Sequence, residues 1–184
     1  MLPRIQADYT GLQPTMTHEF CAWLHQRGWL RRIYTQNVDG LHLHPSLNIP
    51  SEKVVECHGS MRNGNLVLYG DPISTRVVDC CDQDFGDNNV DLMLVMGTSL
   101  QVAPFCAIPN MAPKGCTRVL VNACIQDGFG NDCNGFVTTT TRIGKRKHVS
   151  LKSLWNDVKA NKKWNQLLVE TKCDDFVRHF YSFV

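Results

Sequence analysis

A dense group of hydrogen-bonding side chains lies in the segment "TQNVDG", residues 35–40. Asn37 and Asp39 stand two positions apart and offer an amide donor and a carboxylate acceptor, which together can pair with a carboxamide. Further along the chain, His58 directly follows the run "EKVVEC", and an imidazole can titrate near neutral pH. His58 is therefore the candidate general base, and the remaining histidines are expected to be ordinary core or surface residues.

Small and hydrogen-bonding residues also follow two later apolar runs. Gly97, Thr98 and Ser99 come after "VDLMLVM", and Asn122 ends "TRVLVN". Glycine lets a ligand approach the backbone closely, and hydroxyl and N–H groups suit the oxygens of phosphate and ribose. Each ending alone has a structural explanation, since these residue types also form turns and helix caps. Four such endings together favour a nucleotide-sized ligand that presents hydroxyls, phosphates and a carboxamide.

The elements that must position these residues alternate between strand and helix. This alternation predicts an α/β fold with a Rossmann-like parallel sheet and helices on both faces. The patterns predict helices at 14–27, 73–85, 150–159 and 174–181, and strands at 30–35, 52–57, 64–70, 90–97, 117–122 and 165–170. The runs at 90–97 and 117–122 are continuously apolar, as in strands buried on both faces of a sheet. In such sheets the ligand binds outside the carboxyl ends of the strands, where the polar residues stand.

Length and composition favour a single domain over residues 1–184, with 123–149 as a loop insertion. A net charge of +2 gives no argument for direct nucleic-acid or membrane binding, and no apolar run is long enough for a spanning helix. No signal peptide is expected, so a cytoplasmic or nuclear location is the default. The basic run "RIGKRKH" is interpreted as a solvated loop rather than a nuclear localisation signal.

The chain contains 9 cysteines, scattered without a C-x-x-C pair. Zinc sites usually draw on closely spaced pairs, so this spacing favours reduced, buried thiols over a metal site. We therefore expect the chain to carry no stoichiometric zinc.

Several segments resemble, in order along the chain, the signature blocks of the sirtuins, the NAD-dependent protein deacylases. These segments are "TQNVDGLH", "ECHGS", "VLYGDP", "DLMLVMGTSLQVAPF" and "VLVN". "PTMTHEF" is similar to the family's helix before the first block, and "ETKCDDFV" to its closing block near the adenine. The resemblance covers most of residues 14–122 and returns near 168–180. It implies NAD as the cofactor and an acetylated or acylated protein lysine, histone or non-histone, as the substrate.

The resemblance also implies a role for each matching residue. His58 would deprotonate a ribose hydroxyl of NAD, while the acyl group passes from lysine to ADP-ribose and nicotinamide is released. Cofactor contacts are implied for Gln36, Asn37 and Asp39 at the nicotinamide end, for Gly97, Thr98 and Ser99 at the phosphates and adenosine, and for Asn122 and Cys173 at the adenosine end. The acyl-lysine tunnel and substrate clamp of the family correspond to Val67, Tyr69 and Val102.

Two blocks of the family pattern have no counterpart in this chain. The Gly-rich block is not found before "PTMTHEF", and only residues 61–66 stand where the family carries a zinc module with two cysteine pairs. Zinc is thus implied by the family, but its ligands are absent. The alternative to an enzyme is an inactive sirtuin-like remnant that binds protein or nucleotide. For the chain as given, without the Gly-rich block, we expect NAD affinity no better than about millimolar and no detectable deacylation.

Overall fold

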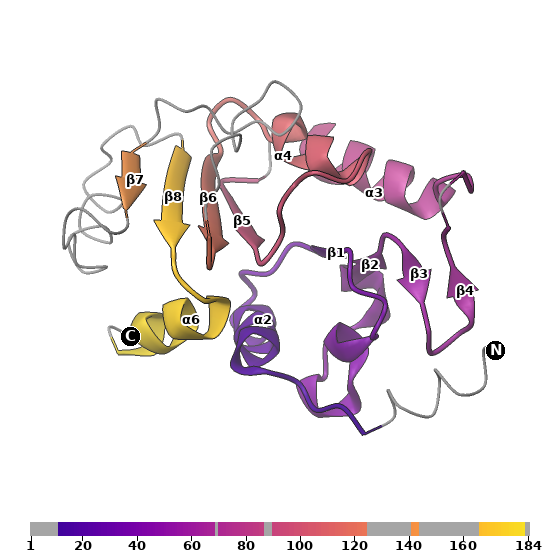
Figure 1. The fold of residues 1–184 in the computed structure, drawn as a ribbon, viewed down its shortest axis with the longest axis horizontal. Coiled ribbons are helices and arrows are strands. Elements are labelled where there is room, and N and C mark those ends of the chain that lie inside the picture. Colours follow the sequence, from indigo (N-terminus) through magenta and orange to yellow (C-terminus); the bar gives the residue numbers. More distant parts are fainter. Residues whose placement is uncertain (1–10, 69, 87–89, 125–140, 144–165, 183–184) are drawn as a thin grey trace. The chain divides into compact units, whose positions relative to one another are not determined.

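Figure 1 shows the computed structural model, which describes residues 11–68, 70–86, 90–124, 141–143 and 166–182. The chain divides into two compact units, Met1–Asp84 and Phe85–Val184. Both units contain parallel strands together with helices, which confirms the predicted α/β class. In the described part of the chain, no helix is long and apolar enough to cross a membrane.

The first unit begins with helix α2, Met16–Gln26, as the spacing of its apolar residues predicts. Thr15 is the N-cap of this helix, and its backbone N–H donates to Nδ1 of His18 at 3.2 Å. The strands β1 (Ile33–Thr35) and β2 (Val54–Glu56) follow, and they pair in parallel. Because parallel strands run in the same direction, the segments after β1 and after β2 begin at the same edge of this pair.

Three short 3-10 helices connect β1 to β2. They are η1, η2 and η3, which cover Leu41–Leu43, Pro45–Leu47 and Ser51–Lys53. Apolar side chains from this connection pack with those of α2, β1 and β2 in one buried cluster. The cluster contains Ala22, Leu47, Ile49 and Val54, with Cys21, Leu30, Ile33 and Leu43 packed against it. Burial of this apolar surface holds the connecting segment against the strand pair.

A short antiparallel hairpin follows β2, formed by β3 (Gly59–Ser60) and β4 (Asn65–Leu66). The prediction of a longer strand over 64–70 is therefore wrong: two residues of this run form a strand, and they turn back on the segment just before them. Gly59 makes this return possible, because it adopts a φ of 75° that other residues rarely accept.

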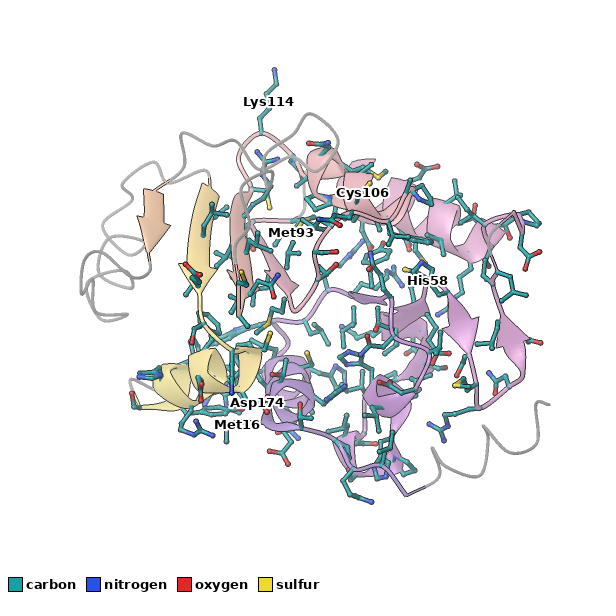
Figure 2. The ribbon with its side chains drawn as sticks, viewed as in Figure 1. Met16, His58, Met93, Cys106, Lys114 and Asp174 are labelled. Carbon is teal, nitrogen blue, oxygen red and sulfur yellow. The ribbon has the colours of Figure 1, made fainter. Side chains whose placement is uncertain are left out.

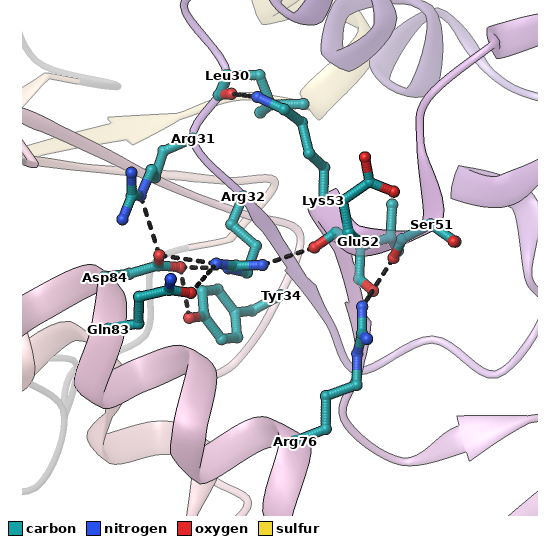
Figure 3. A network of polar contacts seen from close by, with 11 residues as sticks. Leu30, Arg31, Arg32, Tyr34, Ser51, Glu52, Lys53, Arg76, Gln83 and Asp84 are labelled. Carbon is teal, nitrogen blue, oxygen red and sulfur yellow. Dashed lines mark hydrogen bonds and ion pairs between the residues drawn. The ribbon is translucent and has the colours of Figure 1, made fainter.

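Helix α3, Thr75–Gly86, is tied to the strand pair by polar contacts (Figure 3). The Asp84 side chain is 1% exposed and accepts hydrogen bonds from Arg31, Arg32 and Tyr34. The Tyr34 hydroxyl donates to Oδ2 at 2.8 Å, and Arg31 Nε donates to Oδ1 at 3.0 Å. The helix therefore fixes the strand that leads into the polar cluster after β1.

The second unit is built on a four-stranded parallel sheet in the order β5-β6-β8-β7 (Figure 1). Its strands are β5 (Leu92–Met96), β6 (Thr117–Asn122), β7 (Thr141–Ile143) and β8 (Gln166–Glu170). The predicted bounds of β6 are confirmed, and its Leu120 and Val121 are fully buried. A cluster on this sheet joins the strands to the following loop and contains Leu100, Cys106, Leu120 and Leu168, with Val95 packed against it.

Strand β5 differs from its prediction. Leu92 is 48% exposed and the other residues of the strand are half-buried, so the prediction of burial on both faces is wrong for β5. The physical reason is its position, because β5 is the outer strand in the order of this sheet. Met93 on β5 and Cys106 in the segment that follows are labelled in Figure 2.

Short helices complete the second unit. Helices η4 (Phe105–Ala107) and α4 (Ile108–Met111) form the broken helical segment between β5 and β6, and α6 (Cys173–Tyr181) follows β8. The helix predicted at 150–159 lies outside the described residues. Most of the predicted insertion at 123–149 lies outside them too, and its described part includes β7.

Candidate active site

The polar cluster after β1 is held in shape by its own hydrogen bonds. Asn37 N–H donates to the Thr35 hydroxyl at 3.1 Å, and Asn37 Nδ2 donates to Asp39 Oδ2 at 3.3 Å. The other carboxylate oxygen of Asp39 accepts from the backbone N–H of Leu41 at 2.9 Å. The structure thus brings Asn37 and Asp39 together, and the Asn37 side chain is exposed. An amide beside a carboxylate presents the donor and acceptor that a carboxamide requires.

His58 lies two residues beyond the end of β2 (Figure 2). Its Nδ1 lies 3.0 Å from the backbone carbonyl oxygen of Gln36, in the segment after β1. A carbonyl oxygen can only accept, so in the neutral ring Nδ1 carries the proton and Nε2 carries the lone pair. Nε2 is therefore the atom that can take up a proton. The ring is half-buried, and the neighbouring strand end fixes its orientation.

The residues expected at the acyl-lysine tunnel are only partly described. The backbone N–H of Val67 donates to the carbonyl oxygen of His58 at 3.0 Å, so Val67 lies beside the candidate base along the backbone. Tyr69 lies outside the described residues. Val102 belongs to the second unit, where it is half-buried and its carbonyl oxygen accepts from Cys106 N–H at 3.0 Å.

The second unit brings together the strand ends of β5 and β6. Asn122 Nδ2 donates to the backbone carbonyl oxygen of Thr98 at 3.1 Å. Gly97 N–H donates to the Val121 carbonyl oxygen at 3.0 Å, and Gly97 adopts a φ of 65°. Gly97 and Ser99 are exposed, so the backbone at this strand end is accessible. These contacts confirm that the polar residues after β5 and β6 are neighbours, as the parallel pairing predicts.

Cys173 belongs to the same group of residues. It is the first residue of α6, and its Sγ lies 3.9 Å from the carbonyl oxygen of Val121. A Cβ added to Gly97 would lie 3.4 Å from this sulfur, which is an ordinary van der Waals contact, so the two residues are close neighbours. Glycine is favoured at this position by its φ of 65°. Burial, followed by the charge of Asp174, raises the pKa of the Cys173 thiol. The thiol is therefore a neutral packing group, and its helix terminus offers backbone N–H groups.

Each unit, taken by itself, offers groups that suit part of a nucleotide. The first unit offers a carboxamide-compatible pair and a proton acceptor, while the second offers hydroxyls, an exposed glycine backbone and a helix N-terminus. In the described residues, no group of three or more His, Cys, Asp or Glu side chains could hold a metal ion. Burial raises the pKa of the Cys57 thiol to about 12 and that of Cys21 to about 11, which keeps both protonated rather than ready to bind a metal.

Sequence reasoning did not identify two residues that shape this site. Arg62 in the hairpin turn donates to carbonyl oxygens beside the polar cluster, and Asp84 on α3 anchors the strand before it. An isolated arginine or aspartate has no local pattern that reveals such a role. One indirect signal in the sequence is Gly40, because a Cβ at this position would collide with the side chain of Arg62.

The parallel strands and the helices together define an α/β protein with a Rossmann-like core. Residues 4–65 match the model of the Sir2 family. The chain is 33% identical over 150 residues to the NAD-dependent deacetylase sir2A of Dictyostelium discoideum, covering 61% of this chain and 28% of that protein. It is 30% identical over 142 residues to the mouse NAD-dependent protein deacetylase sirtuin-3, covering 60% of this chain and 42% of that protein.

A longer match extends over 196 residues to the NAD-dependent protein deacetylase hst2-1 of Emericella nidulans. The two are 27% identical, and the match covers 82% of this chain and 52% of that protein. Over the matched residues, the chain is therefore similar to the Sir2 family, the sirtuins. It spans about a quarter to a half of the length of these relatives.

Proposed function

We propose that this protein removes acetyl or other acyl groups from lysines of proteins in an NAD-dependent reaction. The observation that carries the proposal is the hydrogen bond from His58 Nδ1 to the Gln36 carbonyl oxygen, which leaves the lone pair on Nε2. A base needs this defined tautomer, and the Gln36 carbonyl that His58 contacts directly precedes Asn37 in the segment after β1. The names of the relatives, which are NAD-dependent deacetylases, support the same activity.

Bound NAD supplies the ribose carbon that accepts the acyl oxygen and the nicotinamide that leaves. The residues of the chain would bind and orient NAD, and one of them would move a proton. His58 would take the proton of a ribose hydroxyl at Nε2, and the Gln36 carbonyl would stabilise the resulting imidazolium through Nδ1–H. Asn37 and Asp39, which lie together in the structure, would hold the nicotinamide carboxamide, with Asn37 donating and Asp39 accepting.

The second unit is proposed to bind the other end of NAD. The exposed backbone at Gly97 and the hydroxyls of Thr98 and Ser99 suit phosphate and ribose oxygens. Asn122 and the backbone at Cys173 would contact the adenosine. In this proposal the acyl-lysine passes along Val67, Tyr69 and Val102, and the protein acts on histone or non-histone targets in the cytoplasm or nucleus.

Nicotinamide release tests this proposal. Peptide-dependent release of nicotinamide by the purified chain, incubated with millimolar NAD and an acetyl-lysine peptide, would support the proposal and overturn the expectation of an inactive chain. His58→Ala should lower the rate by about 10²–10⁴-fold with little change in NAD binding, because only the proton acceptor is removed. His179→Ala is the control, since His179 is exposed on α6. If the parent chain binds NAD but releases no nicotinamide, the inactive nucleotide-binding alternative is correct instead.

A further inference from the structure

The turn of the β3–β4 hairpin carries an arginine that reaches back to the segment after β1. Arg62 Nη1 donates to the carbonyl oxygen of Gly40 at 3.3 Å and to that of Leu43 at 3.0 Å. Gly40 is the N-cap of η1 and Leu43 is its last residue. One guanidinium group therefore contacts both ends of this short helix, and its charge is favourable beside the carbonyl at the C-terminal end.

Gly40 is matched to this arginine. It is buried and has a φ of 70°, and a Cβ at this position would lie 2.2 Å from Cδ of Arg62. The aliphatic stem of Arg62 therefore lies directly across the Cα of Gly40. A backbone contact accompanies it, since Met61 N–H donates to the Val38 carbonyl oxygen at 2.8 Å. The hairpin is thus joined to the polar cluster both by its backbone and by one long side chain.

Helix η1 in turn fixes the Asn37–Asp39 pair. The backbone N–H of Leu41, the first residue of η1, donates to Asp39 Oδ1 at 2.9 Å. The second oxygen of the same carboxylate accepts from Asn37 Nδ2 at 3.3 Å. A displacement of η1 would therefore move Asp39, and Asp39 would carry the Asn37 amide with it.

We propose that Arg62 is a positioning residue for the Asn37–Asp39 pair, acting through η1. The inference rests on the proposed function, in which this pair holds the nicotinamide carboxamide. Arg62 itself touches backbone carbonyls and the glycine, so its removal should loosen the pair without deleting any group that binds the ligand. The hydrogen bonds of a charged donor to two carbonyls are strong enough for this role.

Two variants and one matched control separate the parts of this inference. Arg62→Met keeps an aliphatic chain over Gly40 but removes the donors, and Arg62→Lys keeps a cation. Arg76→Met is the control, because Arg76 also donates to two backbone carbonyls of the first unit. These are the carbonyls of Ser51 at 2.8 Å and Val54 at 3.2 Å, which belong to η3 and β2 rather than to η1 (Figure 3). Each full chain is measured by amide hydrogen exchange and by NMR titration with nicotinamide and with ADP-ribose.

The expected result has three parts. Arg62→Met should speed exchange of the Leu41 and Leu43 amides and weaken nicotinamide binding by about five- to tenfold, with ADP-ribose binding unchanged. The exchange rates and the nicotinamide affinity of Arg62→Lys should lie between those of the parent and those of Arg62→Met. Arg76→Met should have the exchange rates and the affinity of the parent. If Arg62 only stabilised the fold, its replacement would instead weaken the binding of both ligands or of neither.

Each other result overturns the inference in an identifiable way. Unchanged exchange at Leu41 and Leu43 in Arg62→Met would show that the arginine does not order η1, whatever the ligand does. Faster exchange with unchanged nicotinamide affinity would show that η1 does not control the pair. If the parent chain itself binds ADP-ribose but not nicotinamide, the assignment of Asn37 and Asp39 in the proposed function fails, and the positioning role fails with it.

Discussion

Two imidazole rings face each other in the first unit, His18 on α2 and His42 on η1. Their centroids are 4.5 Å apart and the rings are tilted by 50°. Burial, together with the charge that His18 can carry, lowers the pKa of His42 to about 4, and the nearby Asp39 opposes this only in part. Nδ1 of His42 is buried without a hydrogen-bond partner among the described residues. The ring is therefore held neutral next to the segment that carries Asp39.

The lowered pKa of His42 leads us to expect a loss of stability in mild acid. The pKa of His42 is lower in the folded chain than its ordinary value of 6.5, so the unfolded chain takes up the proton first as the pH falls. The free energy of unfolding should decrease between about pH 6.5 and pH 4, by up to about 3 kcal/mol from this group. Denaturant titrations across that range are expected to show the decrease in the parent chain and a flatter profile in His42→Gln. A variant at the exposed His179 should keep the parental profile, and an unchanged slope in His42→Gln would reject the assignment.

At the scale of elements, the contact between α3 and the segment of β1 is centred on one buried carboxylate, that of Asp84. Asp84 is 1% exposed and accepts from two arginines and a tyrosine, and these donors hold its pKa below the usual range although burial acts in the opposite direction. Replacing it by asparagine leaves the guanidinium of Arg32, which is 12% exposed, without its counter-charge.

Asp84→Asn should therefore destabilise the chain by about 3 kcal/mol, as removal of one partner from a buried ion pair does. Chemical unfolding measures this change, and Asp82→Asn on the exposed side of the same helix should change stability by less than about 0.5 kcal/mol. Equal effects of the two substitutions would mean that the network does not connect α3 to β1.

The geometry of the β3–β4 hairpin leads to a second prediction at this scale. A Cβ at Gly59 would lie 1.6 Å from the backbone oxygen of Asn65, whereas a Cβ at Gly64 meets nothing within 4 Å. Both glycines have positive φ values, so alanine at either position carries a conformational cost of about 1–2 kcal/mol. Only Gly59→Ala must also push the two strands apart. Thermal unfolding should show a clearly larger destabilisation for Gly59→Ala, with faster exchange of the Val67 amide; similar values for the two variants would contradict the hairpin geometry.

Some features of these elements can be predicted from the local pattern of apolar and polar residues alone. The bounds of β6 and the polar ends after β1, β2, β5 and β6 follow from apolar runs that stop at hydrogen-bonding residues, and parallel pairing then brings neighbouring ends together. The contact between His58 and Gln36 is a direct result of that pairing.

Other features depend on tertiary context that the sequence pattern does not contain. The apolar run at 64–70 looked like a strand, but the positive φ of Gly59 turns the chain so that only Asn65–Leu66 pairs. The apolar run of β5 does not reveal that the strand is outermost in its sheet. Asp84 meets Arg32 and Tyr34 across separations of 52 and 50 positions, which no local periodicity predicts.

At the scale of the whole molecule, each compact unit contains its own group of residues that the proposed function assigns to NAD. The first unit contains Gln36, Asn37, Asp39 and His58, and the second contains Gly97, Thr98, Ser99, Asn122 and Cys173. Within each unit these residues are linked by hydrogen bonds to their own strand ends. Fragments of NAD can therefore test the residues of each unit separately.

Amide hydrogen exchange with millimolar ADP-ribose and with millimolar nicotinamide tests this division. ADP-ribose should slow exchange at the strand ends of the second unit, near Gly97 and Asn122, because it carries the phosphates and adenosine that these residues suit. Nicotinamide alone should slow exchange only in the first unit, near Asn37 and Leu41, because it carries the carboxamide. Intact NAD should slow both sets in the same sample. Protection of the second unit by nicotinamide, or of neither unit by NAD at concentrations that saturate binding, would show that these residues do not form the proposed cofactor site.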